Sequence, residues 1–160
     1  MSTYATSEAA ALAVVQLLSP FTATNASRGD FRVLDRAGVT QAAVITQARA
    51  SENGDDLGQG RGTQGNRQQR HWLAIVVFQA RGQADDGTSY TSLTALTDTL
   101  VAHLDKYQRL NNATSVKRAQ VREIAEPRLS ARWSAWLFQT ILVEVMTETS
   151  PVVTSGDFAR

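Results

Sequence analysis

The longest stretch of strand-forming sequence in this chain runs from Trp133 to Met146, WSAWLFQTILVEVM. Its fourteen residues are rich in β-branched and aromatic side chains and include neither glycine nor proline. As a strand, the segment would span roughly 46 Å at about 3.3 Å per residue. A domain of this chain length is only about 30–40 Å across. We therefore expect a strand that bends around its own domain or reaches a neighbour, which favours a subunit of an assembly over a free-standing enzyme.

The composition is that of one globular domain. With 160 residues, 42% of them hydrophobic, the chain can bury one core, so we assign residues 1–150 to a single domain and 151–160 to a C-terminal tail. A formal net charge of +1 gives no overall attraction to nucleic acid or membranes, and the absence of cysteine excludes disulfides and thiolate metal sites. No apolar run approaches the roughly 20 residues of a membrane span, so we expect a soluble protein, cytoplasmic where it is made.

The pattern of apolar residues predicts an α+β fold with a mainly antiparallel sheet. Helices are expected at residues 7–18, where Ser7 can cap and Pro20 stops the helix, and at 89–110, where leucines recur every three or four residues. Strands are expected at residues 31–34, 41–50, 72–79, 116–125 and 133–146. The order α-β-β-β-α-β-β predicts two helices packed on one face of the sheet.

Residues 51–70, SENGDDLGQGRGTQGNRQQR, interrupt this pattern as a flexible insertion. They hold five of the ten glycines and almost no apolar side chain, so they bury too little surface to offset the entropy of ordering. Arg61, Arg67 and Arg70, interleaved with glutamines, form a flexible arm that can contact a partner protein or the phosphates of DNA. A solvated loop that does neither is the third interpretation.

The sequence offers no catalytic, cofactor-binding or metal-binding constellation. The two histidines, His71 and His103, have no metal-ligand spacing, and His103 falls off the leucine stripe of its helix, which predicts an exposed side chain. Gly60–Gly65 matches G-x-G-x-x-G, but a strand and not a helix follows it, so we interpret it as a glycine-rich loop. We expect no enzymatic activity and no cofactor.

Candidate interface residues lie around the start of the C-terminal strand. Trp133 and Trp136 are three residues apart, so on a strand they point to opposite faces, one towards the core and one towards a surface. They follow Arg128 and Arg132, which belong to a segment, 106–136, with a net charge of +5. These four residues are our predicted subunit interface.

The order of these segments resembles that of the tail-terminator proteins of long-tailed bacteriophages, also called tail-completion or minor tail U-like proteins. The resemblance covers most of residues 5–148. It is carried by the helix ending at Leu18-Ser19-Pro20, the strand WLAIVVFQ, the leucine-striped helix, the strand Ala119–Ile124 and WSAWLFQTILVEV. It is a resemblance of element order and pattern, since no residue motif is diagnostic of that family.

The resemblance implies a structural virion protein and no enzyme. Its members form a hexameric ring that caps the tail tube, terminates tube polymerisation and joins the tail to the head-neck region. It implies a homo-oligomer that contacts the tail tube protein and a head-neck connector protein, with non-specific contact to DNA in the lumen. The implied location is the tail or neck of the virion, assembled in the host cytoplasm. The 51–70 insertion is longer than a minimal member needs.

Three other functions stay open from the sequence. A head-closure or connector protein of the phage neck would also be a ring. A small-ligand-binding α+β domain would need converging polar groups in a pocket. A nucleic-acid-binding module would use the insertion and the 106–136 segment, although aromatic residues do not interleave with those charges.

Overall fold

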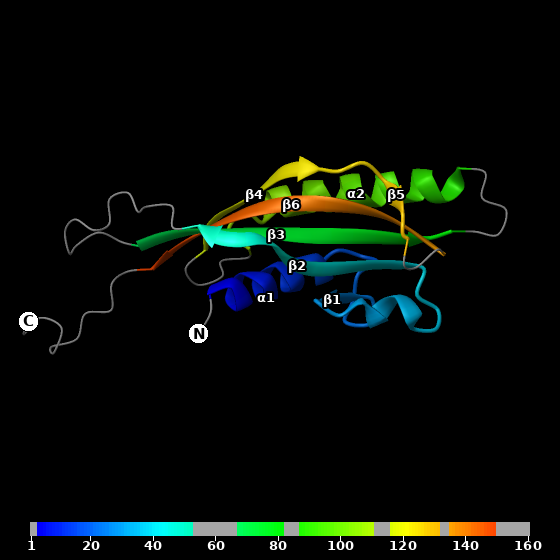
Figure 1. Ribbon diagram of the computed structural model, residues 1–160, viewed down its shortest axis with the longest axis horizontal. Helices are drawn as coiled ribbons and strands as arrows, with labels where there is room; N and C mark the ends of the chain where they lie inside the picture. The colour runs from blue at the N-terminus through cyan, green and yellow to red at the C-terminus, as the bar shows by residue number, and fades with distance from the viewer. Residues whose placement is uncertain (1–2, 53–66, 82–86, 111–115, 132–134, 150–160) are drawn as a thin grey trace, which may run out of the picture.

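The computed structural model describes residues 3–52, 67–81, 87–110, 116–131 and 135–149. Its helices are α1 (Thr3–Gln16), the short 3₁₀ helix η1 (Phe31–Asp35) and α2 (Thr88–Lys106). Its strands are β1 (Ala26–Arg28), β2 (Gln41–Glu52), β3 (Arg67–Ala80), β4 (Val116–Ile124), β5 (Arg128–Leu129) and β6 (Trp136–Thr149). The strands form one six-stranded sheet in the order β1-β2-β3-β6-β4, and β5 pairs with β6 (Figure 1). All pairs are antiparallel except β1 with β2.

The centre of the sheet is a long ribbon made by β3 and β6. The two strands pair in unbroken register over all fourteen residues of each, from Arg67 opposite Thr149 to Ala80 opposite Trp136. Fourteen residues span roughly 46 Å, whereas α1 and α2 are roughly 21 and 28 Å long at about 1.5 Å per residue. At the left of Figure 1, one end of β3 and one end of β6 run on beyond both helices.

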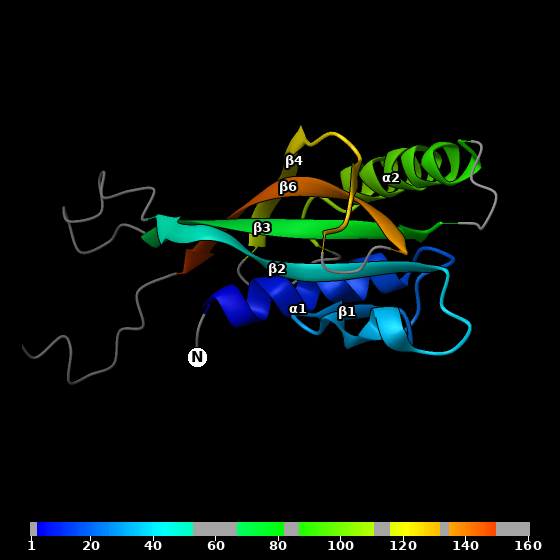
Figure 2. The ribbon, with the colours of Figure 1, turned by 45° about the vertical axis from the view of Figure 1, so that its right-hand side comes forward.

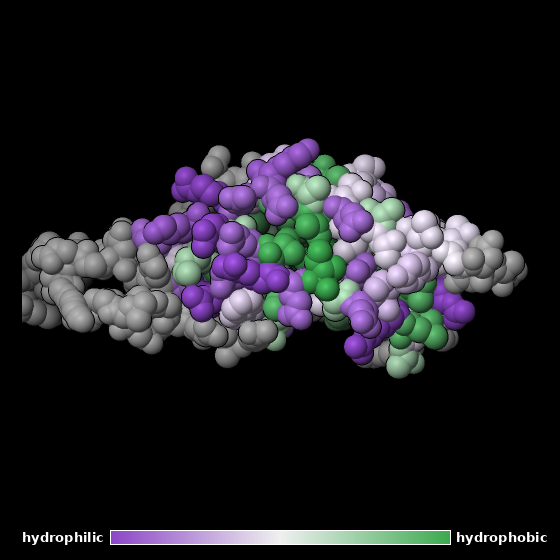
Figure 3. All heavy atoms as spheres, turned by 90° about the horizontal axis from the view of Figure 1, so that it is seen from above, coloured by the Kyte–Doolittle hydropathy of each residue, from purple (hydrophilic) through white to green (hydrophobic). Residues whose placement is uncertain are grey.

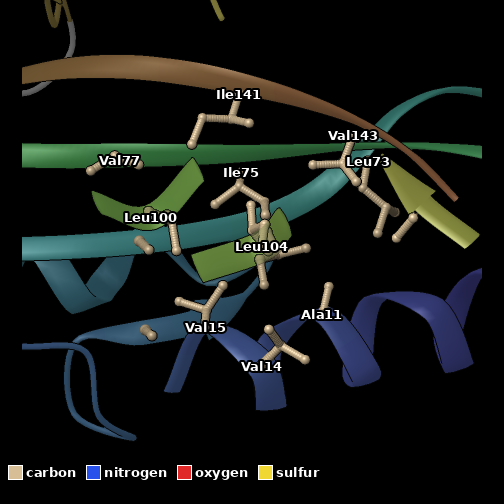
Figure 4. Close-up of a cluster of buried hydrophobic side chains, with 14 of the residues drawn as sticks. Ala11, Val14, Val15, Leu73, Ile75, Val77, Leu100, Leu104, Ile141 and Val143 are labelled. Atoms are coloured by element: carbon tan, nitrogen blue, oxygen red, sulfur yellow. The ribbon is translucent and has the colours of Figure 1, made fainter. Parts of the chain in front are cut away.

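Both helices pack on one face of the sheet. The odd-numbered residues of β3 and β6 point to this face, and those near its centre, such as Ile75 and Ile141, are fully buried. They join Val15 of α1 and Leu100 of α2 in the main hydrophobic core (Figure 4). In Figure 2, α1 lies along β2 while α2 lies beside β6 and β4, so the two helices divide this face between them.

The opposite face is covered at one end only. There η1 places Val33 and Leu34 against Val44, Phe78 and Trp136 in a second, smaller core. Because strand side chains alternate between faces, the even-numbered residues of β3 and β6 belong to this side. The face is called here the open face, since among the described residues no helix other than η1 packs on it.

The predicted fold class is confirmed, and three of its details are wrong. Residues 31–34 belong to the 3₁₀ helix η1 and do not form a strand. The Asp30 carboxylate accepts a hydrogen bond from the Arg32 backbone N–H and so caps this helical turn. The short strand of this region is β1. The insertion is shorter than predicted, because Glu52 still belongs to β2 and residues 67–70 already belong to β3. The last strand begins at Trp136, three residues later than predicted. Residues 53–66 and 151–160 lie outside the described residues.

The core arrangement predicts the cost of shortening one α2 side chain. Leu100 is fully buried between the helices and the sheet, so Leu100→Ala removes apolar contacts and leaves a cavity. We expect a loss of about 2–5 kcal/mol in the free energy of unfolding, measured by urea denaturation. Leu17→Ala is the control, because Leu17 is 55% exposed and its loss should change stability by less than about 0.5 kcal/mol. Equal losses in the two variants would contradict this packing.

Candidate functional site

The predicted arm residues do not form one flexible segment. Arg67 and Arg70 belong to β3, and the Arg70 Nε atom lies 3.1 Å from the Glu144 Oε2 atom of β6. The prediction of a mobile arm is therefore wrong for these two residues, because pairing with β6 orders this part of the chain. Arg61 lies outside the described residues.

Of the predicted interface residues, Arg128 and Trp136 lie near each other where β5 pairs with β6, but only Arg128 is exposed. Trp136 is only 6% exposed, and its ring meets the Phe78 ring edge-on at 6.3 Å between centroids. It is therefore the tryptophan that serves the subunit's own core, and it offers no exposed anchor. Arg128 is exposed on β5, at the edge of the sheet. Trp133 and Arg132 lie outside the described residues.

A three-residue ion network crosses the open face, and the sequence alone did not indicate it. Glu144 of β6 is 8% exposed and lies between Arg70 of β3 and Arg122 of β4. The Arg122 Nη2 and Nε atoms both donate to Glu144 Oε1, at 2.9 and 3.2 Å. One nearly buried carboxylate thus links three neighbouring strands through charge-assisted contacts.

The β4 edge carries further basic residues. The Lys117 Nζ atom donates to Glu148 Oε2 at 3.3 Å, while Arg118 and Arg122 are exposed at the edge of the sheet. Opposite charges on β4 and β6 therefore pair across the two strands, at Lys117–Glu148 and at Arg122–Glu144. The sequence shows bases in β4 and acids in β6, but only the register shows which charges meet.

Both histidines are buried, which overturns the prediction of an exposed His103. The His103 Nε2 atom lies 2.7 Å from the carbonyl oxygen of Val14, to which it donates, and this contact ties α2 to α1. The residue is off the leucine stripe because that side of α2 faces α1 and not the sheet. His71 is fully buried in β3, with Nε2 3.2 Å from the Thr147 hydroxyl oxygen, and burial lowers the pKa of its imidazole.

Hollows on the surface of the described residues include two of about 430 Å³ each. One lies where the loop after α1 meets the loop before β2. There the Arg36 Nη1 atom donates to the carbonyl oxygens of Ala23 and Thr24 at 3.3 and 2.6 Å, which fixes one loop on the other. The second hollow is lined by Arg109, Val116, Lys117 and Glu148.

The described residues contain no group of three or more His, Asp or Glu side chains placed to hold a metal ion. Within the same ranges, neither helix has the length and apolar character needed to cross a membrane.

Comparison with known proteins gives no family assignment. No protein-family model and no curated protein matches the chain. Among 26 matching chains of solved structures is one whose title is only a sequence label. It shares 14% identity, covers 96% of this chain and 99% of its own, and superposes with a TM-score of 0.43. No function is carried over from it.

The ion network predicts a measurable contribution of Glu144 to stability. Glu144→Gln keeps the shape of the side chain but leaves Arg70 and Arg122 without their common partner. Because both arginines are partly exposed, we expect a loss of about 1–2 kcal/mol in urea unfolding, less than the roughly 3–5 kcal/mol of a fully buried pair. The control is Glu148→Gln, which removes the exposed pair with Lys117 and should cost less than about 1 kcal/mol.

Burial of His71 predicts that acid weakens the fold. Because its pKa in the fold lies below the ordinary 6.5, the unfolded chain binds the proton more readily than the folded chain. The stability that the neutral imidazole contributes is therefore present above about pH 6.5 and lost as the pH falls below it. Urea unfolding between pH 8 and pH 5 should show a smaller decline for His71→Gln than for the natural chain. Parallel declines would exclude His71 as the cause.

Proposed function

We propose that this protein is a structural subunit of a phage tail terminator. In this role it assembles into a hexameric ring that caps the tail tube, ends tube polymerisation and joins the tail to the head-neck connector. The proposal rests on the resemblance of element order and on one structural observation, the long β3–β6 ribbon. A second possibility within the phage neck, a head-closure protein, differs in the partner that the ring binds.

The ribbon supports a role in assembly because it is longer than the domain that covers it. At one end of the molecule, the ribbon formed by residues 67–70 and 146–149 runs on beyond both helices (Figure 1). A strand pair that extends beyond its own hydrophobic core gains little stability within a monomer. This end of the ribbon supplies a surface that a neighbouring subunit or the tail tube can bind.

The asymmetry of the sheet also supports a closed ring. One edge is β4 with β5, and the other is the three-residue β1 beside β2, so the two edges differ in length and charge. A contact between β5 of one subunit and the β1 edge of the next is head-to-tail, and six such contacts close when each subunit is rotated by about 60° relative to its neighbour. Closure would also leave fewer strand edges exposed to uncontrolled pairing.

Assembly can be tested with the purified chain and one interface variant. At micromolar concentration we expect ring-shaped particles in negative-stain electron micrographs, and caps at one end of polymerised tail tubes when these are added. Arg128→Glu should shift the sedimentation profile towards the monomer, because Arg128 is exposed on β5 at the sheet edge. Asp98→Lys, an equal charge reversal on the exposed side of α2, should assemble normally.

Binding of the rings to neck connectors but not to tail tubes would instead favour the head-closure function. A monomer that saturably binds a small molecule in the Arg36 hollow would contradict both ring functions.

A further inference from the structure

The outer edge of β4 is open to a further strand. β4 ends the sheet order, so only its inner side pairs with β6. At its start, the Ala119 N–H donates to the Gln108 carbonyl oxygen, which covers that position. From residue 120 to residue 124, the described part of the chain places no backbone hydrogen bond from outside the sheet on this edge.

The side chains on this edge alternate in character between the two faces of the sheet. On the open face, Arg118 and Gln120 stand beside Met146 and Glu144. On the helix face, Val121 and Ile124 stand beside Val143 and Ile141, and Ile124 is 43% exposed although it shares the face of the main core. Figure 3, which views the molecule from the β4 side of Figure 1, shows hydrophobic side chains gathered at its centre between hydrophilic ones.

The inner side of β4 shows what these residues pair with. There, Lys117 and Arg122 meet Glu148 and Glu144 of β6, while apolar residues of the two strands share the other face. On its open face β6 carries the acids Glu144 and Glu148 on either side of Met146, and on its other face it carries apolar residues such as Val143 and Val145. Arg118 and Ile124 offer the same two kinds of contact, exposed on the same strand.

We propose that residues 118–124 of β4 bind an extended segment of a partner protein in which acidic and apolar residues alternate. The segment adds to β4 as a further antiparallel or parallel strand, so main-chain hydrogen bonds give affinity and alternate side chains give specificity. Its acids lie beside Arg118 and Arg122 on the open face, and its apolar residues lie beside Val121 and Ile124. Because Glu123 would repel an acid, the segment carries a neutral residue there.

The partner is another protein and not a second copy of this chain. Among the other strands at the margins of the described sheet, β1 has the sequence ASR, β5 has the sequence RL, and β2 beyond Ile45 has the sequence TQARASE. None of these alternates acids with apolar residues. This inference stands on the β4 edge alone and does not need the ring proposed above.

The test uses the full chain, labelled with nitrogen-15, and a blocked synthetic peptide, Thr-Val-Glu-Val-Glu-Val-Thr. We expect saturable binding in titration calorimetry, with chemical-shift changes and slowed amide exchange centred on residues 120–124. Arg118→Glu should weaken binding about five- to tenfold, because a favourable cross-strand pair becomes a repulsive one. Arg32→Glu is the matched control, since it makes the same charge change on the exposed surface of η1, away from 118–124, and should weaken binding less than twofold.

Three control measurements can overturn the proposal. A peptide with N-methyl groups on alternate amides should not bind, and equal binding would exclude strand addition. A peptide with glutamine in place of glutamate should bind more weakly, and equal binding would exclude recognition of acids. Self-association that blocks the peptide and is lost in Arg118→Glu would mean that a second copy occupies the edge. The peptide experiment is independent of ring formation. The peptide can therefore fail to bind although rings assemble, and it can bind although no rings form.

Discussion

The pairing of β3 with β6 is the constraint on which the rest of the structure depends. The two strands stay in register over their full length, and each supplies every second side chain to one of two cores. A shift of the register by one residue would move Ile75 and Ile141 from the main core to the open face. The helices, η1 and the outer strands all pack on positions that this register fixes. The sheet therefore holds together as one unit around its two central strands.

Most of the fold could be predicted from local patterns, because its central elements are long and strongly apolar. Residues 72–79 lie within β3, and the leucine-striped helix begins one residue before and ends four residues before the predicted bounds of 89–110. The errors arise where a contact with a residue far along the chain determines the local conformation. Residues 67–70 are polar and glycine-poor at the end of a polar stretch, and only Glu144, Thr147 and their neighbours on β6 make them a strand. The segment at Phe31 became helical because of the Asp30 cap.

The candidate site was harder to predict than the fold. The interface residues were predicted from residue type and position in the sequence. Trp136 shows why this is weak evidence, because an aromatic residue suits a hydrophobic core as well as an interface. His103 was expected in solvent because its helix was considered against the sheet only, whereas α1 covers its side. The pairing of bases on β4 with acids on β6 follows from register, which a sequence pattern does not give.

The β3–β6 ribbon carries the two surfaces to which we assign partner binding. One is the end of β3 and β6 beyond the helices, and the other is the β4 edge with its exposed Arg118 and Ile124. Both belong to the sheet, so a partner bound at either is held by the same central strands. The most direct test of the central claim is the mass of the purified chain by native mass spectrometry. The account predicts a closed multiple of the 17.4 kDa subunit, six copies, and a single 17.4 kDa species at micromolar concentration would contradict it.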